Sequence, residues 1–153
     1  MKILIATDGS NYSQAAIEKA CQTVVKTAGC QIEIVSVFEV IPYTGIESLE
    51  VSTEYIVELE KIGRDQATKY ANDAEATIRG RFPDSTLQIM TKIVQGSAGR
   101  VIVEEAQNWG ADVVIVGSHG YGFWSRAFLG SVSNSVVNHA PCSVLIVRSK
   151  GNK

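Results

Sequence analysis

Short strand-like segments that alternate with longer helical ones constrain the fold of this chain more than any other feature. The strand-like segments are apolar or alternate apolar with polar residues, and they comprise residues 3–6, 32–38, 87–93, 113–116 and 144–147. The helical segments carry helical spacing or helix start and stop signals, and they comprise residues 11–28, 54–79, 98–109 and 131–139. This alternation favours a parallel sheet whose right-handed crossovers place helices on both faces. The sequence therefore predicts an α/β fold: a doubly wound three-layer sandwich with a five-stranded parallel sheet of order 3-2-1-4-5 and about four helices.

Three details of the pattern make sharper predictions. Asn11 and Gln14 have the spacing of a capping box at the start of the first helix. Gly63 interrupts the second helical pattern, which indicates a weakened interior and a bend. The alternation in residues 87–93 gives the strand one more polar face, which indicates an edge strand.

Length, composition and charge limit the function classes. With 153 residues, 45% of them hydrophobic and 20% charged, the chain is expected to form one domain over residues 1–153. The formal net charge of −2 disfavours nucleic acid and anionic membranes as partners. The three cysteines lack CxxC spacing and only two histidines are present, so the sequence predicts neither a disulfide framework nor a zinc cluster.

The beginning of the chain reads directly as a strand, without the charged and long apolar regions of a signal peptide. No apolar run approaches the roughly 20 residues that span a bilayer. We therefore expect a cytoplasmic location and no membrane contact.

The long connection from Gly117 to Ser131 follows a buried strand and opens a helix, and connections of this length are usually functional. Gly117 and Gly120 lack Cβ atoms where a ligand would approach backbone N–H groups. Gly130 and Ser131 stand at a helix N-terminus, which favours anions. Arg126 would add a permanent cation. These features predict a loop that holds the phosphates of a nucleotide.

Two better-known phosphate motifs do not match this loop. No lysine occupies it, which excludes GxxxxGK[ST], and Gly120-Tyr121-Gly122 is not followed by the third glycine of the dinucleotide fingerprint. In a doubly wound sheet the ligand lies beyond the carboxyl ends of the strands, where strand order reverses. We therefore expect the loops after the first and fourth strands to be neighbours.

The spaced glycines, the opening Ile3-Leu4-Ile5-Ala6-Thr7-Asp8-Gly9-Ser10 and the closing Pro141-Cys142-Ser143-Val144-Leu145-Ile146-Val147 resemble the nucleotide-binding branch of the universal stress protein family. The resemblance covers nearly the whole chain and implies binding of ATP or a related adenine nucleotide, with Mg²⁺ or Mn²⁺ as a nucleotide-bound ion. It also implies a homodimer, for which the last strand, Val144 to Val147, offers an edge. It implies ligand contacts as follows: Ala6 and Thr7 in the binding site, Asp8 near the ribose or metal, Val37 at adenine, Val116 and Gly117 beside the ribose, and Gly120, Gly130, Ser131 and Val132 at the phosphates.

Several of these residues have a second interpretation. Asp8 also suits a turn or helix cap, Ser131 also suits a cap, and Arg126 also suits a surface ion pair. His119 has no evident nucleophile partner, so it is expected to order the turn or face solvent and is not assigned as a base. Phe123 and Trp124 either pack internally, clamp the ligand or meet a partner.

Three functions remain open at this point. The first is a nucleotide-dependent regulatory or stress-response module, the second a slow ATP hydrolase and the third a ligand-free dimeric interaction protein. The sequence contains no convincing general base, so no catalytic residue is assigned and enzymatic activity is expected to be weak at most.

Overall fold

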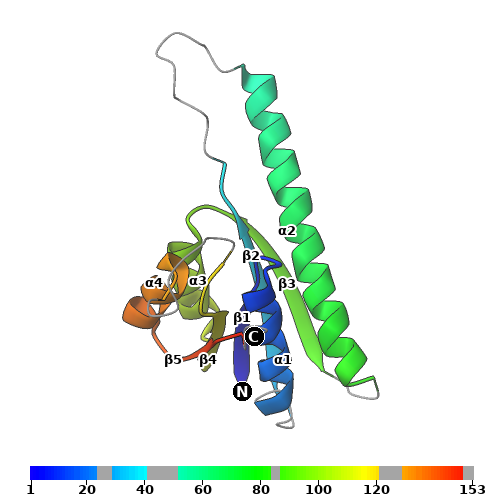
Figure 1. Ribbon diagram of the computed structural model, residues 1–153, viewed down its shortest axis with the longest axis vertical. Helices are drawn as coiled ribbons and strands as arrows, with labels where there is room; N and C mark the ends of the chain where they lie inside the picture. Colours follow the sequence, from blue (N-terminus) through cyan, green and yellow to red (C-terminus); the bar gives the residue numbers. More distant parts are fainter. Residues whose placement is uncertain (24–28, 41–51, 84–86, 121–128, 150–153) are drawn as a thin grey trace.

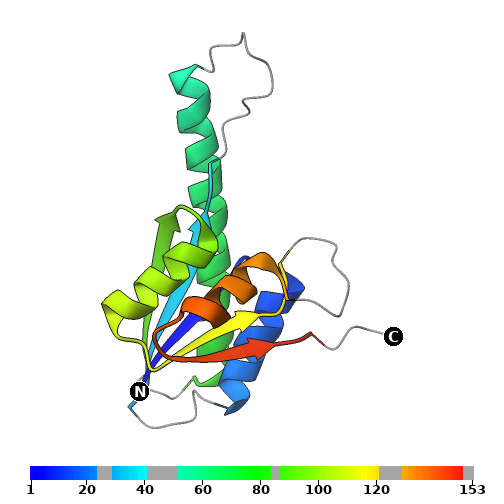
Figure 2. The same ribbon diagram turned by 90° about the vertical axis from the view of Figure 1, so that its left-hand side faces the viewer.

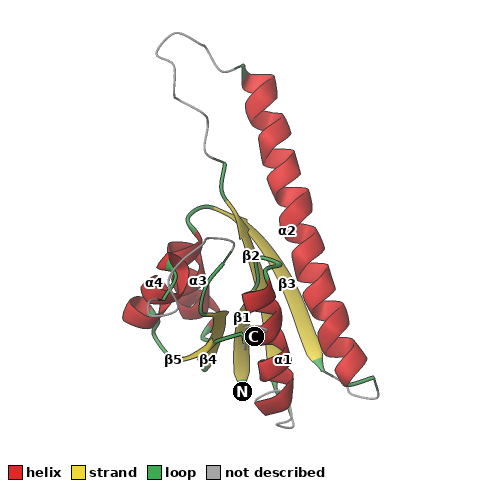
Figure 3. Cartoon of the chain, in the orientation of Figure 1, coloured by secondary structure: helices red, strands yellow, loops and turns green. Residues whose placement is uncertain are grey.

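The computed structural model describes residues 1–23, 29–40, 52–83, 87–120 and 129–149. Within these ranges strands and helices alternate along the chain, as Figure 3 shows. The strands are β1 (Lys2–Ala6), β2 (Gln31–Phe38), β3 (Gln88–Gln95), β4 (Val113–Gly117) and β5 (Ser143–Val147). The helices are α1 (Asn11–Thr23), α2 (Thr53–Arg81), α3 (Ala98–Trp109) and α4 (Ser131–His139).

The five strands form one parallel sheet of order β3-β2-β1-β4-β5 (Figure 1). The predicted fold class and strand order are confirmed, and β3 lies at an edge as its alternating sequence indicated. The strand order reverses at β1, between β2 and β4, which is where a doubly wound sheet leaves room for a ligand. The loops that follow β1 and β4 are neighbours for the same reason.

Helices cover both faces of the sheet (Figure 2). Alternate residues of β1 point to opposite faces, so that Ile3 and Ile5 pack against α1 and α2 while Leu4 and Ala6 pack on the side of α3 and α4. Each face has its own hydrophobic core, and the strand residues of both cores are almost fully buried. The sheet is therefore the middle layer of a three-layer sandwich.

Helix α2 is much longer than the sheet is wide and continues beyond the ends of the strands (Figure 1). The predicted bend at Gly63 is wrong, because the helix runs without interruption from Thr53 to Arg81. A Cβ atom at Gly63 would lie 2.9 Å from the ring of Phe38. The glycine therefore lets the end of β2 approach the helix closely.

The start of α1 also differs from the prediction. Ser10, and not Asn11, caps the helix: its Oγ accepts a hydrogen bond from the N–H of Ser13 (3.3 Å), and its carbonyl accepts one from the N–H of Gln14 (2.9 Å). The side chain of Gln14 is directed to the carbonyl of Gly9 (3.4 Å). A capping box is excluded because the Gln14 amide does not return to the backbone N–H of Asn11. The predicted C-terminal part of this helix, residues 24–28, lies outside the described residues.

A buried carboxyl group lies on the α3/α4 face of the sheet. Glu33 is only 5% exposed, and its Oε1 atom has no hydrogen-bond partner. Burial, reinforced by the nearby Glu105 carboxylate and only partly offset by Lys92, raises the pKa of Glu33 to about 7. Glu105 itself accepts a bond from Lys92 Nζ at 2.6 Å. The protonation state of this face therefore changes near neutral pH.

No helix among the described residues has the length and apolar character needed to span a membrane.

Candidate functional site

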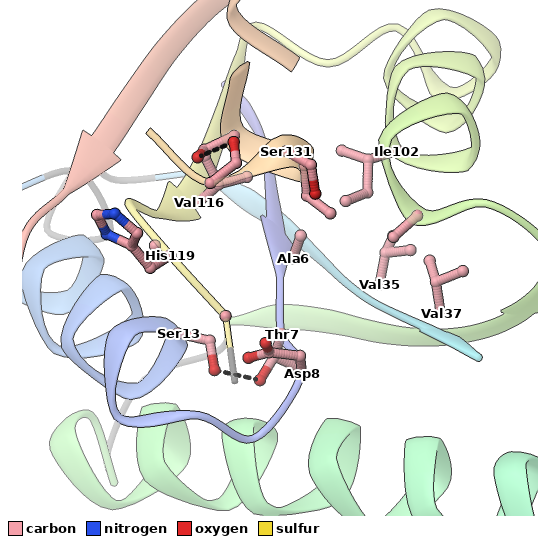
Figure 4. Close-up of a pocket in the computed structure, with 16 residues that line it drawn as sticks. Ala6, Thr7, Asp8, Ser13, Val35, Val37, Ile102, Val116, His119 and Ser131 are labelled. Atoms are coloured by element: carbon pink, nitrogen blue, oxygen red, sulfur yellow. Dashed lines mark hydrogen bonds between the residues drawn. The ribbon is translucent and has the colours of Figure 1, made fainter. Parts of the chain in front are cut away.

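A pocket of about 370 Å³ opens where the strand order reverses, at the carboxyl ends of the central strands. Its walls come from the ends of β1, β2 and β4 and from the N-terminal turns of α3 and α4 (Figure 4). The lining residues are Ala6, Thr7, Asp8, Ser13, Val35, Val37, Ala98, Ile102, Val116, Gly117, His119, Gly120, Gly130, Ser131, Val132 and Ser133.

One side of the pocket is apolar. Val35 and Val37 of β2 face Ile102 of α3, with Ala98 one turn earlier on the same helix (Figure 4). These side chains belong to the core between the sheet and α3/α4, so packing holds them in place. This side of the pocket therefore offers an apolar surface between the strand and the helix.

The other side is polar and is formed by the turn after β1. The Oδ1 atom of Asp8 accepts hydrogen bonds from the backbone N–H (3.0 Å) and the hydroxyl (2.6 Å) of Ser10. The Thr7 backbone donates to the carbonyl of Val35 (3.0 Å), and its hydroxyl pairs with that of Ser13 (3.3 Å). The structure therefore confirms the turn interpretation of Asp8, and Oδ2 remains directed at Gly120, where a Cβ atom would lie 2.8 Å away.

Two glycines of the loop are required for different reasons. A Cβ atom at Gly117 would lie 2.7 Å from the backbone carbon of Tyr12, so this glycine allows β4 to approach the first turn of α1. Among the described residues, the corresponding atom at Gly120 would meet the carboxylate of Asp8. The lack of a side chain at Gly117 thus serves packing against Tyr12, and the residue also lines the pocket.

Helix α4 starts at the pocket. Its N-cap is Gly130 and Ser131 is its first residue, so the predicted cap at Ser131 is displaced by one position. The N–H groups of the first helical turn, beginning at Ser131 and Val132, have no intrahelical partners and carry the positive end of the helix dipole. The N–H of Gly130 is already donated to the carbonyl of Ser118 (2.8 Å). Anion binding at this point depends on the residues after Gly130.

The two ends of the long connection are tied together at Ser118. This residue is 1% exposed, and its carbonyl accepts from both the Gly130 N–H (2.8 Å) and the Ser133 hydroxyl (2.9 Å). Its N–H donates to the carbonyl of Val147 in β5 (2.8 Å). The segment from Ser118 to Gly130 is therefore closed at its base by hydrogen bonds to the sheet and to α4, an arrangement we call the loop neck.

His119 orders the turn, as expected. Its Nδ1 lies 3.1 Å from Ser118 Oγ, and its ring lies 5.2 Å from the ring of Tyr12. The Nε2 atom is buried without a hydrogen-bond partner. Figure 4 shows the imidazole on the side of the pocket away from Val35, Val37 and Ile102.

The structure brings together every described residue of the predicted site. These residues, all at the pocket wall, are Ala6, Thr7, Asp8, Val37, Val116, Gly117, Gly120, Gly130, Ser131 and Val132. Arg126, Phe123 and Trp124 lie outside the described residues. The sequence analysis missed further lining residues, namely Ser13, Val35, Ala98, Ile102 and Ser133. Their only signal is their place in the first turns of helices or at the end of a strand.

The charge of the pocket limits what it holds. Among the described lining residues Asp8 is the only carboxylate, and none is a lysine or arginine. The described part of the chain contains no group of three or more His, Cys, Asp or Glu side chains suited to a metal ion. Mg²⁺ is commonly held by one or two carboxylates together with substrate phosphates. Asp8 Oδ2, which has no hydrogen-bond partner among the described residues, fits that role for an ion that arrives with a ligand, whereas the described groups do not fit an ion bound by protein alone.

The protein is thus a doubly wound α/β domain with an apolar slot, a carboxylate turn and a helix N-terminus around one pocket. The sequence profile of the universal stress protein family matches residues 1–148. The chain belongs to this family. Among its relatives, a universal stress protein of Methanocaldococcus jannaschii, MJ0531, is 31% identical over 147 residues, which cover 96% of this chain and 81% of the relative.

Solved structures share the whole fold. The protein MJ0577 superimposes with a TM-score of 0.76 at 28% identity, covering 99% of this chain and 97% of that one. A universal stress protein family member of Arabidopsis thaliana, solved with AMP bound, has a TM-score of 0.70 at 18% identity and covers 99% of this chain and 93% of its own. A universal stress protein in complex with cAMP has a TM-score of 0.65 at 22% identity, covering 96% of each chain.

Proposed function

We propose that this universal stress protein binds an adenine nucleotide, ATP or a close relative, in the pocket at the carboxyl end of its sheet, and acts as a nucleotide-dependent regulatory module in the stress response. The observation that carries the proposal is the pairing, in one pocket, of an apolar slot with a helix N-terminus. The first suits a flat base and the second suits a phosphate. Members of the family with AMP and with cAMP bound support the same class of ligand.

In this proposal the base lies between Val37 and Ile102, and the backbone of β2 at Val37 provides its polar contacts. The ribose lies over Ala6, Thr7 and Val116, within reach of Asp8 Oδ2. The phosphates meet the N–H groups at the start of α4 and the Ser131 hydroxyl, with Gly120 opposite. Arg126 would supply the cation that the described lining lacks.

A nucleotide that carries Mg²⁺ or Mn²⁺ would have Asp8 Oδ2 as its protein ligand. Such an ion neutralises phosphate charge that one carboxylate would otherwise repel. The described groups support binding more than hydrolysis. Asp8 Oδ1 already accepts two hydrogen bonds from Ser10, and no lysine or arginine among the described lining residues would stabilise charge on a leaving phosphate.

The proposal also includes a homodimer. Strand β5 ends the sheet at the edge opposite β3, and its Val144, Leu145 and Ile146 are only half-buried. An apolar edge strand of this kind pairs readily with a copy of itself across a two-fold axis. Light scattering after size exclusion would detect the dimer, and a monomer at tens of micromolar would contradict it.

The decisive experiment fills the apolar slot. Ala98→Leu adds a branched side chain at the pocket wall on a half-buried position, so we expect at least a tenfold loss of nucleotide affinity with little change in melting temperature. The matched control is Gln107→Leu, an exposed position on the same helix. Calorimetric titration with ATP, ADP, AMP and cAMP measures the affinity. Equal affinities for both variants and the parent protein would show that the base does not bind in this slot.

A further inference from the structure

The N-terminal part of α2 extends beyond the sheet (Figures 1 and 2), and apolar side chains are exposed on it. Tyr55 is 47% exposed and Ile62 is 57% exposed, and the half-buried Leu59 lies between them. We call these three residues the α2 tip stripe. Large apolar side chains that cluster on a projecting helix are a mark of an interaction surface.

The stripe is separate from the side of α2 that packs on the sheet. The sheet-facing side contains Gly63 against Phe38, followed by the buried Ala67 and Ala71. At 100° per residue, the three residues of the α2 tip stripe fall within a sector of about 60°, centred roughly 100° from the sheet-facing side. The helix therefore presents a second apolar side where no described element covers it.

We propose that the α2 tip stripe binds the same stripe of a second copy of this chain, with the two helices antiparallel and a two-fold axis beside Leu59. In this register Tyr55 of one copy lies over Ile62 of the other, and the reverse contact is made as well. The two Leu59 side chains meet near the axis. An isologous contact of this kind uses one surface twice, so it needs no other partner.

The charges beside the stripe favour this arrangement. Glu58 and Lys61 are exposed on the same flank of the stripe, and neither has an ion-pair partner among the described residues. An antiparallel pair centred near Leu59 brings each Glu58 next to the Lys61 of the other copy. A parallel two-fold pair would place the Glu58/Lys61 flanks of the two copies on opposite sides of the contact, so these charges would not meet. An antiparallel register moved to Ile62 would place Leu59 against the charged Asp65.

The contact is small and is expected to be weak. Three side chains and two ion pairs bury less than the roughly 1,200 Å² of a standard stable interface, so the dissociation constant should be on the order of 100 µM. The stripe belongs to the helix beside β3, whereas β5 forms the opposite edge of the sheet. The contact through α2 can therefore form between chains that are already paired through β5, and it does not require a ligand in the pocket.

The first experiment measures association by sedimentation equilibrium from 10 to 500 µM. Self-association should double the mass as the concentration rises. Ile62→Glu should raise the dissociation constant of this step at least tenfold. Val57→Glu is the matched control, because Val57 is 58% exposed on the same turns of the helix but lies on the opposite flank. Equal association of the two variants, or a parent protein whose mass does not change over this range, would overturn the proposal.

The second experiment tests the antiparallel register. Single variants Tyr55→Cys and Ile62→Cys are mixed and mildly oxidised, with the parent protein and its three native cysteines as background. The proposal expects a mixed disulfide between the two variants, and much less of the disulfide of either variant with itself. Preferential Tyr55→Cys self-pairing would overturn the register.

The third experiment exchanges the charges. Glu58→Lys alone and Lys61→Glu alone should each weaken association, because each homodimer then contains like charges at both positions. An equimolar mixture of the two variants restores both opposite-charge pairs and should recover the parent affinity within about threefold. A mixture no better than the single variants would overturn the charge pairing, and raised salt should weaken the parent dimer.

Discussion

The two faces of the sheet differ in how completely they are packed. On the α1/α2 face the strand residues Ile3, Ile5, Ile32 and Ile34 are almost inaccessible to solvent and meet apolar helix residues. The α3/α4 face has a core of its own, but it also contains the buried Glu33 and leaves the pocket open at its carboxyl end. A smaller hollow of about 250 Å³ lies between α1 and α2, but the larger pocket and the buried carboxyl group both lie on the α3/α4 side of the sheet.

This difference suggests how the fold supports an open site. A pocket leaves apolar side chains without neighbours, and a buried carboxyl group has to be kept neutral or paired. Each feature lowers the free energy of unfolding. The closed face supplies compensating stability through contacts that do not depend on a ligand. The predictions below test this division from the largest expected effect to the smallest.

Shortening a side chain should lower the free energy of unfolding more on the α1/α2 face than on the α3/α4 face. Ile34→Ala removes a fully buried side chain between β2 and the α1/α2 layer, so it should lower the free energy of unfolding by about 3 kcal/mol. Val37→Ala, on the same strand but at the pocket, should cost about 1 kcal/mol, because its side chain already borders open space. Urea unfolding measures both values. Equal losses would refute the proposed asymmetry.

The buried carboxyl group should make the α3/α4 face sensitive to pH. The pKa of Glu33 is higher in the folded protein than in the unfolded chain, about 7 against 4.5. The folded protein is therefore most stable below pH 4.5, where Glu33 is neutral in both states, and it loses stability as the pH rises to about 7. A shift of this size corresponds to on the order of 3 kcal/mol at pH 8. Glu33→Gln should therefore become more stable, relative to the parent, as the pH rises from 4 to 8.

Thermal unfolding at several pH values would measure this difference. Glu18→Gln is a suitable control, because Glu18 is a carboxylate of the α1/α2 side that pairs with Arg81 at the surface. The stability of Glu18→Gln relative to the parent protein should not rise with pH. A Glu33→Gln difference that stays constant between pH 4 and pH 8 would show that Glu33 ionises normally in the folded protein.

The smallest effect is expected at the loop neck. Ser133→Ala removes the hydroxyl that donates to the Ser118 carbonyl, and a hydrogen bond of this kind contributes about 1 kcal/mol. The melting temperature should fall by about 3 °C, and the amide of Gly130 should exchange faster with solvent. Ser143→Ala, at an exposed position of β5, should change neither quantity. Unchanged exchange at Gly130 would show that the neck is held without Ser133.

The sequence predicted the sheet correctly because strand composition and connectivity are local signals. The position of the pocket followed from the topology, and the glycine pattern identified its backbone wall at Gly120 and Gly130. The features that the sequence did not reveal depend on contacts between segments that are distant in the chain. Ala98 and Ile102 enter the pocket only because α3 packs over β2, and the reason for Gly117 is the backbone of Tyr12.

Glu33 illustrates the same limit in a strand. Its charge interrupts an otherwise apolar run, and nothing in the neighbouring sequence indicates that β3 and α3 enclose it. Gly63 looked like a helix defect because the ring of Phe38, which occupies the space beside it, is remote in the chain. Local patterns therefore indicated which elements form, and only the tertiary structure explains why particular small or charged residues stand in them.

The closure at Ser118 has a consequence for variation and engineering. Because residues 118 and 130 are joined by hydrogen bonds that also reach β5 and α4, the two stem positions are fixed by the scaffold. A stretch of another length or composition can be grafted between them at only a small cost in chain entropy. Changes of length or composition between the two stem positions should therefore leave the strands and helices of the scaffold in place.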